Sequence, residues 1–237
     1  MATDLSATQD DRVLTYTRAL SLFITPFLLV AFVLLYLFPG DTKRFFAWTI
    51  TPTMTPMVLA SAYCGGAYFF LRVLRESRWN VVKTGFLSVA LFASLLGVTT
   101  IIHWGKFNHG HIAFWLWAGL YFTAPVLVFG AWLANRRFAA PPGVGEQRLG
   151  TIAQWVVGMI GLLALVQGIM MFLAPARVIP IGPWMLTPLT CSVVGAIFCR
   201  GSAGIGVVRG PRVARVRLML RVGWRVGAVG LVGGGAG

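Results

Sequence analysis

Residues 18–38 read RALSLFITPFLLVAFVLLYLF, and this unbroken apolar run decides the class of fold. A helix needs about 20 apolar residues to cross a hydrocarbon core of about 30 Å. The run is continuously apolar rather than alternating, which predicts a helix and not a barrel strand. It is also longer than the apolar region of a signal peptide, and the polar residues 1–17 before it contain several acids. We therefore expect a membrane-spanning helix preceded by a polar segment.

The composition of the whole chain extends this expectation. Hydrophobic residues make up 57% of the 237 residues and charged residues 11%, and the mean hydropathy is +0.79. Soluble domains carry about a quarter charged residues, so a water-soluble fold could not cover this much apolar surface. We expect an all-α, polytopic integral membrane helix bundle without a soluble domain. About six transmembrane helices are predicted, at about 18–38, 50–71, 84–103, 112–134, 150–173 and 185–207.

The distribution of Lys and Arg predicts the orientation of the bundle. Nine lie in the N-terminal segment and the second and fourth loops, against four in the alternate loops. Positive charge concentrates on the cytoplasmic side, so residues 1–17 are expected in the cytoplasm and the topology is N-in, C-in. Residues 18–207 then form the transmembrane domain. Tryptophans near the predicted helix ends are interpreted as interface anchors: Trp48, Trp104 and Trp184 on the outer side, and Trp79 and Trp155 on the inner side.

The first and last predicted hairpins are similar in sequence when the chain is shifted by 136 residues. Nine of the 31 positions from 37 to 67 are then identical. The pattern predicts that helices 1–2 and 5–6 form a parallel repeat about an axis along the membrane normal. A simpler interpretation is two well-formed helix starts, each with an interface Trp, a capping Thr and a Pro in the first turn. The motif residues that align are Trp48 with Trp184, Thr51 with Thr187 and Pro52 with Pro188.

Two stretches in this region carry a family resemblance. Residues 46–50 (FAWTI) and 63–68 (YCGGAY) resemble uncharacterised bacterial multi-pass membrane proteins. The resemblance covers most of the chain up to about residue 205 and implies a multi-pass protein of the bacterial inner or plasma membrane. It implies no activity, substrate or site residue.

All three histidines lie in the segment 103–111, HWGKFNHGH, at the predicted turn between the third and fourth helices. Imidazoles here could bind a transition metal, serve as axial haem ligands or relay protons. No carboxylate accompanies His103, His109 and His111, so a metal would need a further ligand such as Asn108, and the spacing matches no zinc motif. The alternative is a wet polar turn at the level of the lipid headgroups.

Other polar residues are sparse. Asp41 in the first loop could receive an ionic solute or could lie in a solvated turn, and Gln167 could bond to a neighbouring helix or face a solute path. No acid falls within a predicted span, so carboxylate-driven ion coupling and paired-acid hydrolysis lack their usual residues. The chain has neither a G-x-S-x-G elbow nor a P-loop, and we predict no catalytic residue. The three cysteines are interpreted as small apolar packing residues.

The last part of the chain differs in composition from the rest. Apart from Arg18 at the first position of the span 18–38, Arg200 is the one charge within a predicted span, where it could snorkel toward the cytoplasm or mark an altered sequence. Residues 208–237 form a basic tail rich in Gly, Arg and Val. The tail could lie on the anionic leaflet, could bind nucleic acid, or could be a frameshifted end of the reading frame. We favour the frameshift, and nucleic acid is not expected as a partner.

Three classes of function remain open. A small-solute permease or channel-like protein is favoured by the repeat and the proline-marked helix starts. A metal- or haem-binding redox protein would depend on the histidines, and a structural or accessory subunit would explain the lack of intramembrane charge pairs. No cofactor is predicted beyond the haem or metal of the second class. The expected partners are the lipid bilayer and either further copies of the chain or another membrane protein.

Overall fold

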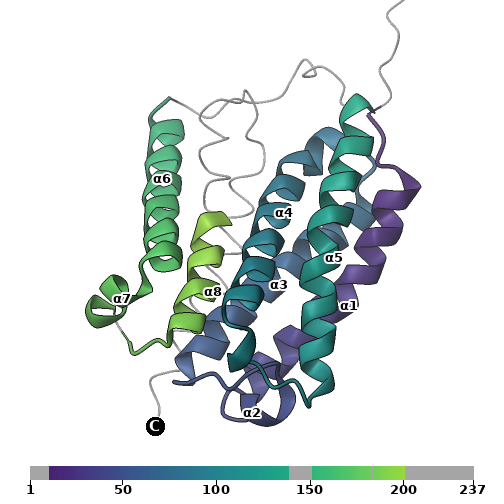
Figure 1. The fold of residues 1–237 in the computed structure, drawn as a ribbon. Coiled ribbons are helices and arrows are strands. Elements are labelled where there is room, and N and C mark those ends of the chain that lie inside the picture. Colours follow the sequence, from purple (N-terminus) through teal and green to yellow (C-terminus); the bar gives the residue numbers. More distant parts are fainter. Residues whose placement is uncertain (1–10, 139–150, 183, 201–237) are drawn as a thin grey trace, which may run out of the picture.

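The computed structural model describes residues 11–138, 151–182 and 184–200 (Figure 1). Regular structure in these residues is helical, and extended pairing is limited to one antiparallel bridge between Arg12 and Arg78. Five helices are long and apolar enough to cross a membrane, which confirms an all-helical fold with apolar spans. The elements are α1 (Thr15–Leu37), α2 (Thr42–Phe45), α3 (Met54–Arg75), α4 (Trp79–Ile102), η1 (Trp104–Lys106), α5 (Ile112–Asn135), η2 (Arg136–Phe138), α6 (Thr151–Leu173), α7 (Pro175–Val178), η3 (Ile179–Ile181) and α8 (Pro188–Cys199).

The largest difference from the predicted boundaries lies between the second and third spans. The predicted connection at 72–83 shrinks to three residues, because α3 continues to Arg75 and α4 begins at Trp79. The Trp79 side chain is fully buried and packs against Phe86, with ring centroids 5.1 Å apart. The prediction of Trp79 as an interface anchor is therefore wrong, because this residue packs the first turn of α4 into the core.

α1, α3, α4, α5 and α8 form a ring of helices. α1 packs along α3, α4 packs along α5, and α1 also contacts α5. α8 contacts both α3 and α4 and so lies between them, which closes the ring. α6 packs on α8 and stands apart from α4 and α5, with α8 between them in Figure 1.

One end of the ring, here called the α2 end, holds α2, η1 and the start of α8 (Figure 1). Trp48 lies there, 2% exposed, with edge-on ring contacts to Phe107 at 5.2 Å and Trp117 at 4.8 Å. The backbone N–H of Asn108 donates to the carbonyl of Ala47 at 2.9 Å, which ties this segment to the α4–α5 turn. The prediction of Trp48 as an interface anchor is wrong, because the loop folds back over the turn and buries the ring.

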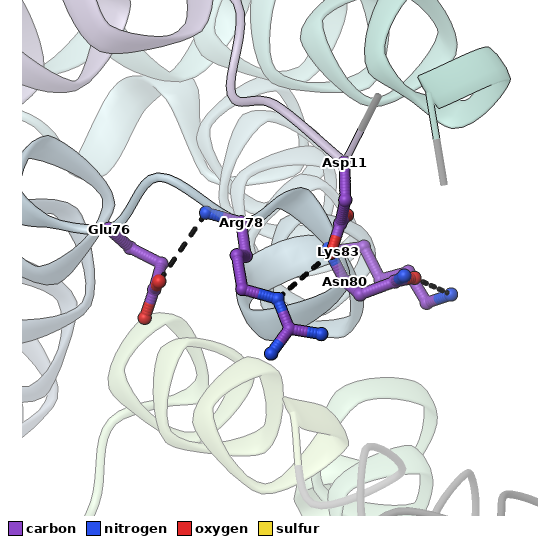
Figure 2. Close-up of polar contacts among 5 residues, drawn as sticks. All are labelled: Asp11, Glu76, Arg78, Asn80 and Lys83. Atoms are coloured by element: carbon purple, nitrogen blue, oxygen red, sulfur yellow. Dashed lines mark hydrogen bonds and ion pairs between the residues drawn. The ribbon is translucent and has the colours of Figure 1, made fainter. Parts of the chain in front are cut away.

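At the opposite end, Asp11 joins the N-terminal segment to the start of α4 (Figure 2). Its carboxylate accepts from the backbone N–H of Asn80 at 2.8 Å and pairs with the Arg78 guanidinium at 3.3 Å. The N-cap residue of α4 makes no side-chain cap of its own. Asp11 therefore supplies the anionic cap that the positive end of the helix dipole favours. The Lys83 ammonium donates to the Asn80 side chain at 2.7 Å and extends the network.

The sixth predicted span, 185–207, corresponds to α8, which the structure describes as 12 residues up to Cys199. The remainder of that span, the tail at 208–237 and most of the segment 1–17 lie outside the described residues. Within α8, Cys191 and Cys199 are buried and unpaired, as expected of small packing residues.

Candidate functional site

The three histidines lie at the α2 end, where α4 meets α5, and two of them bond to the backbone of these helices. His103 caps the end of α4, with Nδ1 3.2 Å from the carbonyl of Thr99. His111 is the N-cap of α5, where its Nδ1 accepts from the backbone N–H of Ala113 at 3.2 Å. His109 packs its ring against Phe114, with centroids 4.6 Å apart. His103 thus caps the end of α4, and His111 caps the start of α5.

This arrangement limits what the histidines could hold. Because Nδ1 of His111 accepts a hydrogen bond, the neutral ring carries its proton on Nε2, which leaves no second lone pair for a metal. Nε2 of His109 is buried without a hydrogen-bond partner. Across the described ranges, no three or more His, Cys, Asp or Glu side chains lie close enough together to hold a metal ion. Asn108 is exposed and bonds through its backbone rather than joining the imidazoles.

Asp41 and Gln167, the other polar candidates, are both exposed. The Asp41 carbonyl accepts from the backbone N–H groups of Arg44 and Phe45 at 2.9 and 3.1 Å, and its carboxylate does not cap α2. This is the geometry of a solvated turn. Gln167 lies on α6 away from α8, and the described residues offer it no cross-helix hydrogen bond.

The two W-x-x-T-P motifs differ in local structure. At α8 the motif acts as predicted: Pro188 is the first helical residue, and the Thr187 hydroxyl accepts from the backbone N–H of Thr190 at 3.2 Å. At α3 the prediction of a Thr51 cap is wrong, because the helix begins only at Met54. Trp184 is partly buried in a small second cluster with residues of α7 and α8.

A cavity of about 40 Å³ lies inside the ring, and it combines polar groups that sequence reasoning did not bring together. Its wall is formed by apolar side chains of α1, α3, α4 and α5, together with Tyr63, Tyr121 and Arg200. Tyr63 and Tyr121 lie near the middle of α3 and α5. The cavity therefore lies at mid-depth in helices of membrane-spanning length, and it is large enough to hold water.

Two of the residues that line the cavity are tyrosines whose hydroxyls bond to each other. Tyr121 Oη donates to Tyr63 Oη at 3.1 Å, and both residues are buried. Trp117 packs on the Tyr121 ring with centroids 4.3 Å apart, and its indole N–H donates to Thr100 at 2.9 Å. These contacts fix the Tyr121 ring, so its hydroxyl is held at the cavity by packing on one side and by Tyr63 on the other.

Arg200 brings a positive charge to the same cavity. α8 rises about 18 Å over its 12 residues, so Arg200 at its end lies well inside a core of about 30 Å. The guanidinium lies over the Phe92 ring, 5.3 Å from its centroid. A charged side chain at mid-membrane costs about 2.5–3.5 kcal/mol on insertion scales, and a desolvated cation–π contact offsets about 2 kcal/mol. The Arg200 side chain therefore packs inside the ring of helices and does not extend to the membrane surface, as a snorkelling side chain would.

A larger hollow of about 570 Å³ lies between α4 and α5 near Pro125. Its lining is apolar apart from Ser94, whose hydroxyl donates to the Ala90 carbonyl at 2.8 Å. Unlike the smaller cavity, this hollow is lined by no ionisable side chain. The smaller cavity inside the ring is accordingly the candidate functional site.

The sequence contained one signal for this site. Arg200 stood out as a charge within a predicted span, whereas Tyr63 and Tyr121 are 58 residues apart and no spacing rule connects them. In comparisons with known proteins, the chain matches no protein-family model, no curated protein and no solved structure. Function is therefore argued from the site alone.

Proposed function

We propose that the protein is a small-solute permease or channel-like membrane protein whose solute site is the cavity inside the ring. The observation that carries this proposal is that Tyr63, Tyr121 and Arg200 line one cavity at mid-depth in an otherwise apolar bundle, with the two tyrosine hydroxyls bonded to each other. Ionisable groups within spans usually serve solute or ion pathways, because they are costly to keep there. Solute sites of many transporters lie at this depth between helices.

The proposed internal repeat is supported by the helix boundaries. α1 and α6 are both 23 residues long, and their first residues are separated by the 136-residue shift that aligns the sequences. Each is followed by a four-residue helix and then by a further apolar helix. Helix pairs repeated in this way are common in transporters. In such a repeat, α3 and α8 would occupy equivalent positions in the two copies.

The proposed orientation, with the start of α1 in the cytoplasm of a bacterial cell, is supported by charge. At the end of the bundle where α1 begins, the structure describes eight basic residues: Arg12, Arg18, Arg72, Arg75, Arg78, Lys83, Arg136 and Arg137. At the α2 end it describes four: Lys43, Arg44, Lys106 and Arg177. The excess lies on the side that the positive-inside rule assigns to the cytoplasm.

Solute flux through reconstituted vesicles tests the proposal. Stopped-flow light scattering follows vesicle volume as a small neutral or anionic solute enters, in vesicles with and without the protein. Ala124 is buried and lines the cavity, whereas Ala19 is exposed on α1. We expect protein-dependent entry of at least one solute, slowed several-fold by Ala124→Val and unchanged by Ala19→Val. Entry at the rate of empty vesicles for every solute, or equal rates in the two variants, would contradict the proposal.

A second candidate, a bound transition metal or haem at the histidine turn, is favoured by the buried and unpartnered Nε2 of His109. Here His103 and His109 would be the ligands, since His111 caps α5. An absorption spectrum and metal analysis of the purified protein, beside His109→Ala, provide the test. A Soret band or stoichiometric metal that His109→Ala abolishes would support this candidate, and its absence from folded protein would exclude it.

A further inference from the structure

The positive charge of Arg200 has no acidic counterpart in the cavity. The residues that line the cavity include no Asp or Glu. Within the described part of the chain, the guanidinium makes neither a hydrogen bond nor an ion pair, and it lies over the Phe92 ring. A guanidinium carries five N–H donors and no acceptor, so these donors are available to a ligand.

The tyrosine pair offers a further donor. When one hydroxyl donates to the other, the second hydroxyl keeps a proton that needs its own acceptor. In the arrangement observed, Tyr121 donates and the Tyr63 proton remains, and no described residue accepts it. Exchanging the two roles leaves the Tyr121 proton instead. The residues that line the cavity therefore include one cation and one hydroxyl whose proton lacks a described acceptor, and a single anion could neutralise the first and accept from the second.

The size of the cavity limits that partner. A cavity holds one water molecule for about every 10–15 Å³ of the space open to water-sized probes, and this cavity measures about 40 Å³ by that measure. A halide ion or a one-carbon carboxylate is of this order, whereas a sugar or an amino acid is several times larger. The rest of the lining is apolar, and in such surroundings the attraction between an anion and the guanidinium is stronger than in water.

We propose that the cavity binds a small monovalent anion, of the size of chloride or formate, between the Arg200 guanidinium and the hydroxyl pair of Tyr63 and Tyr121. The proposal rests on the proposed solute site and names the class of solute. The anion supplies the negative charge that the residues lining the cavity lack, and it accepts hydrogen bonds from donors that the described residues leave unused.

Anion binding is measured on purified protein in detergent, in buffer whose only other anion is gluconate, which is too large for the cavity. Chloride and formate are titrated while thermal unfolding and tryptophan fluorescence are recorded. Trp117 packs on Tyr121 and reports on the cavity. Arg200→Gln removes the charge, and Arg177→Gln is the matched control because Arg177 is exposed on α7. We expect saturable binding in the wild type and in Arg177→Gln, and at least tenfold weaker binding in Arg200→Gln.

Two further variants separate binding from folding. Tyr63→Phe keeps the ring and removes the free donor, and it should weaken binding three- to tenfold without loss of the folded state. Arg200→Lys keeps the charge and should restore part of the affinity that Arg200→Gln loses. No saturable response to either anion in the wild type, or equal affinity in Arg200→Gln, would overturn the proposal.

The same experiment distinguishes this proposal from the proposed function. If Ala124→Val slows the flux of a neutral solute but the protein binds no anion, the permease proposal stands and the anion-site proposal is wrong. If anion binding depends on Arg200 but the protein supports no solute flux, the anion-site proposal stands and the permease proposal is wrong.

Discussion

Gly168 of α6 and Gly195 of α8 lie backbone against backbone. A Cβ added at Gly168 would approach the Gly195 carbonyl oxygen to 2.7 Å, and one added at Gly195 would approach the Gly168 carbonyl oxygen to 2.8 Å. Small residues allow such close crossings between membrane helices, where packing contributes most of the association. This crossing attaches α6 to the helix that carries Arg200.

A large side chain at Gly168 should therefore separate α6 from α8. We expect Gly168→Leu to lower the thermal unfolding temperature by several degrees, because the backbones cannot approach. Gly119 on α5 is the matched control, since a Cβ there meets nothing within 4 Å and the position is exposed. Unfolding of detergent-solubilised protein, followed by circular dichroism, measures both variants. Equal unfolding temperatures for Gly168→Leu and Gly119→Leu would show that the crossing is not close.

Replacement of Asn135 should destabilise the junction of α1 and α5. Asn135 is fully buried, accepts from the backbone N–H of Leu14 at 3.0 Å, and donates to Thr17 and to the Ala131 carbonyl. Loss of these bonds leaves buried polar groups unpaired at about 1–3 kcal/mol each. We expect Asn135→Ala to lower the free energy of unfolding in denaturant by about 2 kcal/mol or more.

Asn108→Ala is the control for that measurement, because the Asn108 side chain is exposed and the backbone contact to Ala47 survives the change. It should remain within about 0.5 kcal/mol of the wild type. A loss as large as that of Asn135→Ala would show that the buried amide has no special role.

Removal of the Asp11 carboxylate should weaken the start of α4. Asp11→Ala loses the cap on Asn80 and the pairing with Arg78 (Figure 2). Loss of an N-cap costs about 0.5–2 kcal/mol, whereas Asp11→Asn keeps an acceptor and should lose less. Hydrogen exchange of the first turn of α4, measured by mass spectrometry, should rise in Asp11→Ala. Asp41→Ala, which removes a carboxylate that caps nothing, should leave it unchanged.

The proposed orientation predicts which ends of the helices can be reached from outside the cell. With the native cysteines replaced by alanine, Lys106→Cys at the α2 end should react with a membrane-impermeant maleimide in intact cells. Arg137→Cys, beyond the end of α5, should react only after the membrane is opened. The reverse pattern would invert the topology.

Sequence reasoning was most reliable where one physical property dominates. The span predicted at 112–134 is α5 at Ile112–Asn135, because a long apolar run has few alternatives to a buried helix. It failed where distant segments meet: the position of Trp48 near a helix end predicts an interface residue, whereas its ring packs against Phe107 and Trp117.

The candidate site was beyond sequence reasoning for the same reason. A pairing of Tyr63 with Tyr121 depends on how α3 and α5 face the ring, and no local pattern encodes that. The cap supplied to α4 by Asp11 likewise depends on a contact between residues 69 positions apart. Composition locates membrane helices, whereas their packing decides which polar groups meet.

Cross-linking can test whether α8 closes the ring and carries Arg200 to the cavity beside Phe92. Phe92→Cys is combined with Arg200→Cys in a chain without native cysteines, treated with a short bifunctional thiol reagent, and analysed by peptide mass spectrometry. We expect an intramolecular link between the two positions, and none when Phe92→Cys is combined with Arg177→Cys. Absence of the link from folded Phe92→Cys/Arg200→Cys protein would place Arg200 outside the ring and contradict the account.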